Sequence, residues 1–392
     1  MIRRSTGRSL TVVVAGTPWD GVWQSERHLA MQLARRGPVL WVDPQISRLT
    51  PLLDGSVRSA LREDRLRPVA PNLIRLTPVT VPGVTRPILR DVASRGARRA
   101  VRRAVDRIGL PVATTIVASL NDMLDVVPCE TSVFFGTDDY VAGARLMGTD
   151  PDWLQRCTDR QLERADVVIA TSQALADRWS EVREDIHVIP NGCDFERLSR
   201  ADRAPLPEDV ELPRPIAGFI GHMSDRIDLE MLDAVADTGS SLLLVGPRQP
   251  TFEIARLDAL IVRPNVQWVG AKRFTELPSY LRLIDVGLTP YSQSPFNRAS
   301  FPLKTLDYLA AGIPVVASDL PAHRWLGTGQ VHITFSASEF GARTDALLAE
   351  PRRSEVTRAC QRVAADNSWA SRAAEIVELV ESTQAPAGSA VA

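Results

Sequence analysis

The sequence predicts an α/β protein made of two domains, each built around a parallel β-sheet. The chain has 392 residues, which is too long for one ordinary hydrophobic core. Short β-branched runs alternate with longer amphipathic patterns, and this rhythm is typical of β-α-β units. The rhythm stops at a stretch rich in proline and charge, 199–215, and then starts again. Two domains joined by a linker therefore fit the sequence best.

The order of the predicted elements supports this division. Predicted strands of the first half lie at 11–15, 38–42, 114–120, 132–136, 166–172 and 187–194, and those of the second half lie at 216–221, 241–247, 265–270, 285–291 and 313–318. Helical patterns follow at 25–36, 228–237, 275–284, 302–311 and about 352–381. We therefore predict an N-terminal Rossmann-like domain at 1–198, a linker at 199–215, a C-terminal Rossmann-like domain with a final helix at 216–382, and a disordered tail at 383–392.

The composition excludes several classes of protein. Apolar residues make up 44% of the chain, charged residues make up 24%, and the net charge is −1. These values are those of a folded protein and give no reason to expect a nucleic-acid partner. The four cysteines are far apart in the sequence, so neither a disulfide framework nor a zinc site is expected, and a reducing cytoplasm fits best. No apolar run reaches the length of a membrane span or of a secretory signal.

The most informative segment is FPLKTLDYLAAGIPVVASD, from Phe301 to Asp319. A proline opens a predicted helix there, and the first N–H groups of a helix have no partner within it, which suits a diphosphate. Lys304 adds a positive charge to the first turn, and Asp307 lies one turn further on the same face, where it can bind ribose hydroxyls. Lys304 is also one of two lysines among 46 basic residues. The alternative is a surface helix with an ordinary Lys–Asp pair.

This segment resembles the donor-binding loop and helix of glycosyltransferase family 4. Three further segments resemble the same family: GFIGHMSDRIDLEMLDAVAD from 218, ERADVVIATSQAL from 163 and HVIPNGCDFERL from 187. The GHMSDRID pattern is similar to a bacterial branch linked to cell-wall and teichuronic acid polysaccharides. The resemblance covers residues 12 to about 370. It implies the GT-B fold, in which two Rossmann-like domains face each other across a cleft at the carboxyl ends of their strands.

The resemblance also implies a donor site in the second half of the chain. Its expected residues are Gly221, His222, Arg226, Ser300, Phe301, Pro302, Leu303, Lys304 and Asp307. The chain departs from the family at Ala299, where a first glutamate is common, and at His222 and Ile227, where an arginine and a lysine often neutralise the diphosphate. Arg226 is expected to take over part of that task, because a guanidinium binds phosphate through two hydrogen bonds. The alternatives are a polar turn residue for His222 and a helix-entry residue for Arg226.

The first half of the chain carries the expected acceptor side. In the loop after the first strand, Trp19 and Trp23 are expected to stack on a sugar ring, and Asp20 is expected to hold a hydroxyl group. Asp138 and Asp139 follow another strand, and one of these adjacent carboxylates is expected to face the reacting sugar. The alternatives are aromatic rings that cover the core and carboxylates that cap a helix.

The resemblance implies a transferase that retains the anomeric configuration and has no dedicated protein base. A donor phosphate oxygen would take the acceptor proton while the protein stabilises the departing diphosphate. The expected catalytic residues are Asp138, His222, Arg226 and Lys304. The nucleotide diphosphate sugar is a substrate, so no cofactor is expected. A metal is not expected either, because the DxD pattern at 150–152 fits a helix cap followed by a first-turn proline.

Two other functions stay open at this point. A sugar-nucleotide epimerase of the same fold would bind a similar donor, and a degenerate homologue would bind a nucleotide or a protein partner without catalysis. An epimerase should carry acid and base residues around the sugar, and none stands out in the sequence. The departures at Ala299, His222 and Ile227 are the features that favour a degenerate homologue.

The pattern at 95–108 predicts a helix with two very different faces. Small apolar residues form a narrow face that suits packing on the first domain. The opposite face carries Arg95, Arg98, Arg99, Arg102, Arg103 and Arg107. Since acceptors of envelope transferases are often lipid-linked, we expect this stripe to dock the enzyme on an anionic cytoplasmic leaflet. The alternative is a solvated charged face with no partner.

Overall fold

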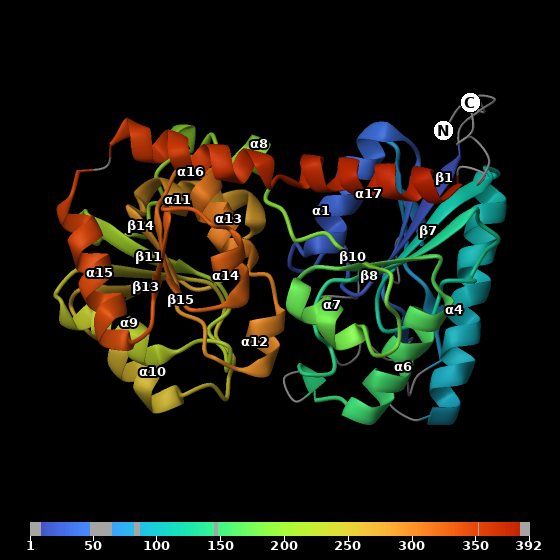
Figure 1. The fold of residues 1–392 in the computed structure, drawn as a ribbon, viewed down its shortest axis with the longest axis horizontal. Helices are drawn as coiled ribbons and strands as arrows, with labels where there is room; N and C mark the ends of the chain where they lie inside the picture. The colour runs from blue at the N-terminus through green and yellow to red at the C-terminus, as the bar shows by residue number, and fades with distance from the viewer. Residues whose placement is uncertain (1–8, 48–64, 82–86, 145–147, 352, 385–392) are drawn as a thin grey trace. The chain divides into compact units, whose positions relative to one another are not determined.

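The computed structural model describes residues 9–47, 65–81, 87–144, 148–351 and 353–384 (Figure 1). The chain forms two compact units, each with its own parallel sheet. Unit 1 contains Met1–Ile189 and Arg372–Ala392, and unit 2 contains Pro190–Ser371. The predicted tail at 383–392 lies mostly outside the described residues.

Unit 1 contains an eight-stranded sheet in the order β10-β9-β8-β7-β1-β2-β5-β4. Its strands are β1 (Leu10–Ala15), β2 (Val39–Val42), β4 (Leu66–Ala70), β5 (Leu73–Leu76), β7 (Val112–Ala118), β8 (Thr131–Gly136), β9 (Val167–Ala170) and β10 (Ile186–Val188). All neighbouring pairs are parallel except β4 with β5, which is antiparallel. A separate short sheet pairs β3 (Ile46–Ser47) with β6 (Val79–Thr80).

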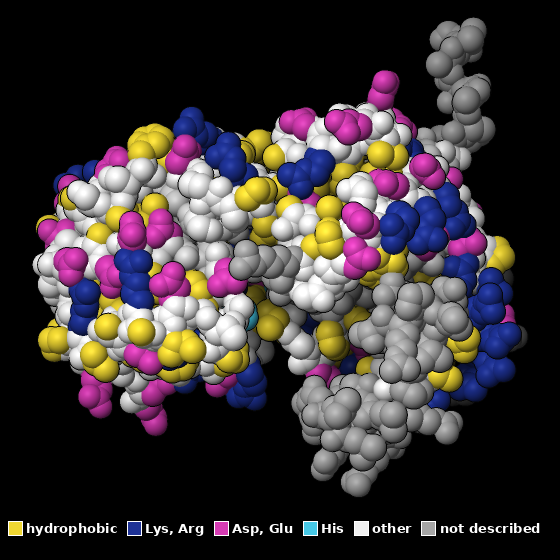
Figure 2. Space-filling view, turned by 90° about the horizontal axis from the view of Figure 1, so that it is seen from below, with side chains coloured by type: hydrophobic (Ala, Val, Ile, Leu, Met, Phe, Trp, Pro, Cys, Tyr) yellow, Lys and Arg dark blue, Asp and Glu magenta, His cyan; other side chains and the backbone are white. Residues whose placement is uncertain are grey.

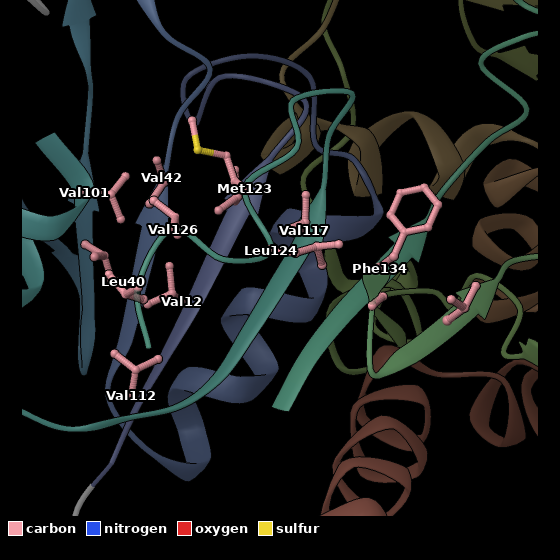
Figure 3. Close-up of a cluster of buried hydrophobic side chains, with 14 of the residues drawn as sticks. Val12, Leu40, Val42, Val101, Val112, Val117, Met123, Leu124, Val126 and Phe134 are labelled. Carbon is pink, nitrogen blue, oxygen red and sulfur yellow. The ribbon is translucent and has the colours of Figure 1, made fainter. Parts of the chain in front are cut away.

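Helices cover both faces of this sheet because its central strands are apolar on both sides. The helices of unit 1 are α1 (Ser25–Arg36), α4 (Pro87–Ile108), α6 (Pro151–Arg164), α7 (Gln173–Trp179) and most of α17 (Trp369–Gln384). On one face, Val12, Leu40 and Val101 point into a single buried cluster (Figure 3). On the other face, Leu33 of α1 and Ile376 of α17 line a cavity of about 410 Å³ together with residues of β1 and β7.

Helix α4 confirms the predicted division of faces and begins earlier than the sequence pattern indicated. Ala97, Val101 and Ala104 are buried in the core of unit 1. Arg98 and Arg102, however, are not part of a free outer face. Arg98 donates hydrogen bonds to the Asp122 carbonyl at 2.8 Å and to the Asp125 carboxylate, and Arg102 donates to the Val126 carbonyl at 2.9 Å, so both hold the segment that follows β7.

Unit 2 contains a fully parallel sheet in the order β13-β12-β11-β14-β15-β16. Its strands are β11 (Ile216–Ile220), β12 (Ser241–Val245), β13 (Val266–Trp268), β14 (Val286–Thr289), β15 (Val315–Ser318) and β16 (Val331–Thr334). The helices that pack on it are α9 (Leu229–Asp237), α10 (Ile254–Ile261), α11 (Leu277–Leu283), α13 (Leu303–Ala310), α15 (Ala337–Ala349) and α16 (Ser354–Asp366).

Alternate residues of the strands serve two separate cores in unit 2. Ile216 and Ile220 face the core formed with α11, α13 and α16, whereas Ala217 and Phe219 face the core formed with α9, α10 and α15. This two-residue alternation explains the continuous apolar runs that the sequence shows at these strands. The sheet is therefore covered by helices on both faces.

The segment 199–215, expected as a linker, packs within unit 2. Ala201 is buried in its core, the Ala204 carbonyl accepts a hydrogen bond from Arg282, and the Asp209 carboxylate pairs with Lys272 at 2.5 Å. The chain instead passes between the units after Ile189 and again at Arg372, inside α17. The prediction of a linker was wrong because it depended on the many prolines and charged residues of the segment. The side-chain contacts that hold the segment on unit 2 produce no periodic pattern in the sequence.

Candidate active site

The expected donor residues lie at the carboxyl edge of the sheet of unit 2. The loop after β11 and the loop after β12 approach each other closely there. A Cβ atom on Gly246 would lie 1.9 Å from the carbonyl oxygen of Gly221, and Gly246 has a φ of +141° that other residues rarely adopt. The loop after β11 is also bonded to the loop after β14, since Ser292 N–H donates to the Arg226 carbonyl at 2.9 Å. Loops at this edge form the usual ligand site of an open parallel sheet.

Helix α13 presents its N-terminus to this edge. Pro302 is the N-cap residue, and no side chain within the described chain caps the first turn. The N–H groups of that turn therefore keep their positive partial charge for a ligand. Leu306 and Leu309 on the opposite face are fully buried and fix the helix on the sheet.

Lys304 and Asp307 form an ion pair on the first turn of α13. The distance between Lys304 Nζ and Asp307 Oδ2 is 2.9 Å. The Lys304 side chain is 26% exposed and that of Asp307 is 11% exposed, so both polar ends remain within reach of a ligand. The two residues that the sequence singled out thus lie together.

Tyr308 fixes the position of α13 relative to β11. Its hydroxyl group accepts a hydrogen bond from the Ile220 N–H at 2.6 Å and donates one to the Gly218 carbonyl at 2.9 Å. Its ring also occupies the space above Gly287, where a Cβ atom would lie 2.4 Å from it. The first turn of α13 is therefore held beside the residues that follow β11, Gly221 and His222.

Arg226 is held by one amide and two aromatic rings. Its Nε donates to Asn297 Oδ1 at 2.9 Å, and its guanidinium carbon lies 4.7 Å from the ring centre of Phe296 and 5.5 Å from that of Tyr291. Asn297 is completely buried and also donates to the Arg226 and Ser292 carbonyls. In the described chain the two terminal amino groups of Arg226 form no hydrogen bond, so they stay free for a ligand.

His222 is solvent-exposed and lies beside this arginine. Partial desolvation lowers the pKa of His222, and the positive charge of Arg226 lowers it further. The imidazole is therefore neutral at pH 7 and offers a ligand a hydrogen bond rather than a full charge. Ile227, at the position where the family often has lysine, is buried in the core.

The remaining donor residues shape the backbone before α13. Ser300 is buried and its hydroxyl group donates to the Phe296 carbonyl at 2.9 Å. Phe301 is buried against Trp325, and its carbonyl accepts from Asn191 Nδ2 at 3.0 Å. Pro302 is buried and Leu303 is half-buried. These residues position the loop, and the one polar side chain among them, Ser300, is bonded to the Phe296 carbonyl.

The buried histidine His323 is hydrogen-bonded to α13. His323 Nδ1 lies 2.7 Å from the Ser318 carbonyl, which only accepts, so Nδ1 carries the proton. Nε2 then accepts from the Thr305 hydroxyl group at 3.1 Å. Burial lowers the pKa of His323 to about 4, although the Ser318 carbonyl and Asp319 oppose the shift. A neutral imidazole thus links α13 to the end of β15.

In unit 1, the carboxyl edge of the sheet contains a dense polar network centred on Asp43. This buried carboxylate accepts from the Trp19 N–H and Trp41 Nε1, both at 2.8 Å, and pairs with Arg75 Nε at 2.5 Å. Arg75 also donates to Asp20 at 2.6 Å. Asp20 itself is 68% exposed, so it retains access to a ligand.

The expected acceptor residues differ strongly in exposure. Trp19 is 7% exposed and packs edge to face on Trp41, so its ring covers the core, whereas Trp23 is half-buried. Asp139 is buried, pairs with Arg178 and accepts from the Ala142 N–H at 2.9 Å, which gives it a structural task. Asp138 is half-buried at the end of β8 and is the better placed of the two carboxylates for a ligand.

The DxD pattern forms the expected helix cap. The Asp150 side chain accepts from the Asp152 N–H at 3.0 Å, and Pro151 occupies the first position of α6.

In the described chain no helix is long and apolar enough to cross a membrane.

Several residues of the site had no clear sequence signal. Asn297 and Tyr308 act through partners far away in the sequence, and His323 is bonded to Ser318 and Thr305 on neighbouring elements. Asp43 and Arg75 meet only because β2 and β5 are neighbours. The Ser294–Pro295 pair, which begins the short helix α12 (Pro295–Ala299), was the one local hint that Asn297 lies in a helical turn.

Two family models match successive parts of the chain. Residues 19–197 match the model described as Glycosyltransferase Family 4, and residues 214–351 match the model described as Glycosyl transferases group 1. Together they cover most of both units.

One curated relative is the putative teichuronic acid biosynthesis glycosyltransferase TuaH of Bacillus subtilis. It is 35% identical over 170 residues, which are 42% of this chain and 43% of that protein. The match thus spans less than half of the relative's length.

Solved structures share the fold over almost the whole chain. Sucrose-phosphate synthase of Thermosynechococcus elongatus is 19% identical with a TM-score of 0.72, covering 96% of this chain and 99% of that one. HepE of Anabaena, solved in complex with UDP-glucose, is 14% identical with a TM-score of 0.64, covering 95% and 99%. The lipopolysaccharide glycosyltransferase WaaG is 12% identical with a TM-score of 0.62, covering 94% and 99%. At these identities the likeness establishes the fold alone, and it confirms the GT-B architecture.

Proposed function

Because this chain belongs to the GT-B glycosyltransferases of the family 4 type, we propose that it transfers a sugar from a nucleotide diphosphate sugar to an envelope glycan, lipid-linked or other acceptor. The observation that carries the proposal is the uncapped N-terminus of α13 with Lys304 on its first turn, at the carboxyl edge of the sheet. The relative TuaH is named for teichuronic acid biosynthesis, which supports an acceptor of the envelope glycan class.

The donor diphosphate would lie between α13 and the loop after β11. The helix N–H groups and Lys304 bind its oxygens from one side, and the free amino groups of Arg226 bind from the other. Negative charge grows on this diphosphate as the sugar leaves, so cations and dipoles fixed beforehand stabilise the transition state more than the ground state. His222 adds a neutral hydrogen-bond donor.

The nucleoside would extend from the diphosphate along α13, so that its ribose lies beside Asp307. The Asp307 carboxylate would then accept hydrogen bonds from the ribose hydroxyls. Complexes of HepE with UDP and UDP-glucose support a nucleotide of this class as the donor.

We further propose that transfer retains the anomeric configuration and needs neither a metal nor a cofactor. Positive groups of the protein take the place of a metal beside the diphosphate, which is the role of Lys304 and Arg226. Asp138 in unit 1 is proposed to face the reacting sugar, because it is the carboxylate of its pair that stays accessible.

A docking surface for the cytoplasmic leaflet is the second part of the proposal. Figure 2 shows Lys and Arg side chains gathered along the side of the molecule where α4 lies in Figure 1. We name the exposed arginines at four-residue spacing on this helix the α4 stripe: Arg95, Arg99, Arg103 and Arg107. Among the residues that the structure describes, no member of the stripe has an acidic partner. Like charges at this spacing repel each other, and anionic lipid headgroups would relieve that repulsion.

Incubation with a panel of labelled nucleotide sugars tests the proposed reaction. We expect transfer to an added glycan or lipid-linked acceptor, with slow hydrolysis of the donor when the acceptor is omitted. Release of an epimerised sugar would identify an epimerase instead. Binding of nucleotide without any turnover, across the whole panel of sugars and acceptors, would identify a degenerate transferase.

A further inference from the structure

Arg27, in the first turn of α1, is clamped between two tryptophan rings. Its guanidinium carbon lies 4.2 Å from the ring centre of Trp19 and 3.9 Å from that of Trp23. Cation–π contacts of this kind fix the plane of the guanidinium and shield it from water. The side chain is therefore rigid before any ligand arrives.

The clamped guanidinium is short of hydrogen-bond acceptors. Its Nη1 donates to the Trp19 carbonyl, while its Nε is buried and has no hydrogen-bond partner. In the described part of the chain, Arg27 forms no ion pair. Nε is thus shielded, and Nη2 is the guanidinium nitrogen that has no partner in the described chain and stays available to an oxygen of a carboxylate or phosphate.

The neighbouring carboxylates do not neutralise Arg27, because another arginine uses them. Asp43 and Asp20 are both bonded to Arg75, at 2.5 Å and 2.6 Å. Burial lowers the pKa of Arg27 to about 10, and repulsion from Arg75 adds to that shift while Asp20 and Asp43 oppose it. A half-buried cation without a direct counter-ion is costly for a folded protein. Such a site gains most from an anion that the ligand brings.

The position of Arg27 agrees with a ligand site. The loop that carries Trp19 and Trp23 follows β1, and Asp43 follows β2, so the cluster lies at the carboxyl edge of the sheet of unit 1. Open parallel sheets bind ligands at this edge. Trp23 is half-buried, and its ring contacts both Arg27 and His28.

We propose that Arg27 and Trp23 form a subsite for an oxyanion on the acceptor, so that this chain prefers acidic acceptors to neutral ones. The proposal rests on the proposed transferase function, since it specifies the acceptor of that reaction. A carboxylate of an acidic sugar and a phosphate of a carrier present the same kind of oxyanion to the Nη2 amino group of Arg27. Trp23 would hold the guanidinium in place for this contact.

The first experiment compares ligands on the unmodified protein, so it does not depend on how a variant folds. The full chain is titrated with methyl glucuronide, with uncharged methyl glucoside and with glycerol phosphate, and binding is followed by ligand-observed NMR. We expect methyl glucuronide or glycerol phosphate to bind at least about 10-fold more tightly than methyl glucoside, because only they offer an oxyanion. The arm that responds identifies carboxylate or phosphate as the natural group.

Variants then assign the preference to Arg27. Arg27→Gln should abolish the preference, and Arg27→Lys should retain only part of it, because a flexible ammonium group is not held between the tryptophan rings as the planar guanidinium is. Arg36→Gln is the matched control, since Arg36 is exposed in the last turn of the same helix, and it should bind like the unmodified protein. Equal binding of the acidic and neutral probes, or a preference that survives in Arg27→Gln, would overturn the proposal.

Calorimetry with a nucleoside diphosphate on the same samples separates this proposal from the donor assignment. The donor residues lie in unit 2 and Arg27 lies in unit 1, so Arg27→Gln should leave nucleotide affinity unchanged. A chain that binds acidic probes through Arg27 but binds no nucleotide would refute the transferase function and keep the oxyanion subsite. A chain that binds nucleotide but shows no preference for the acidic probes would refute the oxyanion subsite and leave the proposed transferase function standing.

Discussion

Replacing Lys304 with alanine is expected to weaken the binding of a nucleoside diphosphate by about 1.5 to 3 kcal/mol, or roughly 10- to 150-fold. The range is that of one hydrogen bond to a charged group. Two features of the structure place the loss in the upper part of this range. The Lys304 side chain is only 26% exposed, so water screens its charge weakly, and its removal leaves the Asp307 carboxylate 2.9 Å away without its counter-ion. The incoming phosphates would then meet an unpaired negative charge.

A double variant tests whether this second effect exists. Asp307→Asn combined with Lys304→Ala removes the unpaired carboxylate, so it should bind the diphosphate more tightly than Lys304→Ala alone. Inorganic pyrophosphate titrated by calorimetry is the appropriate probe, because it presents the phosphates without the ribose that Asp307 is proposed to bind. The stability of the chain should change by less than about 1 kcal/mol, since partly exposed ion pairs contribute little.

The second lysine of the chain provides the control. Lys272 is also paired with an aspartate, Asp209, and its side chain is 20% exposed, but it lies outside the first turn of α13. Lys272→Ala should therefore leave nucleotide affinity unchanged. If Lys304→Ala binds the diphosphate as tightly as the unmodified protein, the α13 N-terminus is not the donor site. If both lysine variants lose affinity equally, the effect is a general one of charge.

Three other perturbations test separate parts of the reasoning. Changing the four arginines of the α4 stripe to glutamine should abolish co-sedimentation with anionic liposomes at low salt, since each arginine contributes on the order of 1 kcal/mol to binding. Charges are least screened at low salt, so an unmodified protein that does not bind such liposomes there would refute the proposed docking. In the folded state the pKa of His323 is about 4, whereas its ordinary value is 6.5. As the pH falls from 6.5 to 4, the unfolded state therefore takes up a proton that the folded state does not, and the folded state loses stability. Hydrogen exchange of α13 amides should show a loss of about 2 kcal/mol at pH 5 relative to pH 7, and an unchanged loss in His323→Asn would assign it elsewhere. Gly246→Ala should destabilise the protein by more than about 1 kcal/mol, because of its positive φ and the contact with Gly221; an unchanged melting temperature would contradict that view of the loop.

The sequence predicted the strands of unit 2 well because five of its six strands are short apolar runs bounded by turns. It missed β4 and β5, where Pro68 and Arg75 interrupt the apolar pattern. Arg75 is compatible with a strand only because Asp43 and Asp20 accept its hydrogen bonds, and that partnership cannot be read from neighbouring residues. The same limit explains why 199–215 was expected to be a linker.

The site shows a similar contrast between local and distant determinants. Lys304 and Asp307 were predictable because a helix fixes the distance between residues three apart. Arg226 was predictable only as a candidate. Its fixed position depends on Asn297 and Phe296, about 70 residues later in the chain. Trp19 and Trp23 had the same sequence signal, yet one covers the core and the other stays accessible.

The way in which the arginines are paired indicates where this protein meets its ligands. Many described arginines form an ion pair with an acidic side chain, and Arg75 is bonded to two aspartates. Arg226, Arg27 and the α4 stripe are among the described arginines that form none. Arg226 and Arg27 are instead held by aromatic rings, which orient a guanidinium without neutralising it. In a chain with a net charge of −1, the unpaired arginines at the two sheet edges and on α4 are the places where we propose that anions bind from outside the protein: the donor diphosphate, an acidic acceptor and a membrane surface.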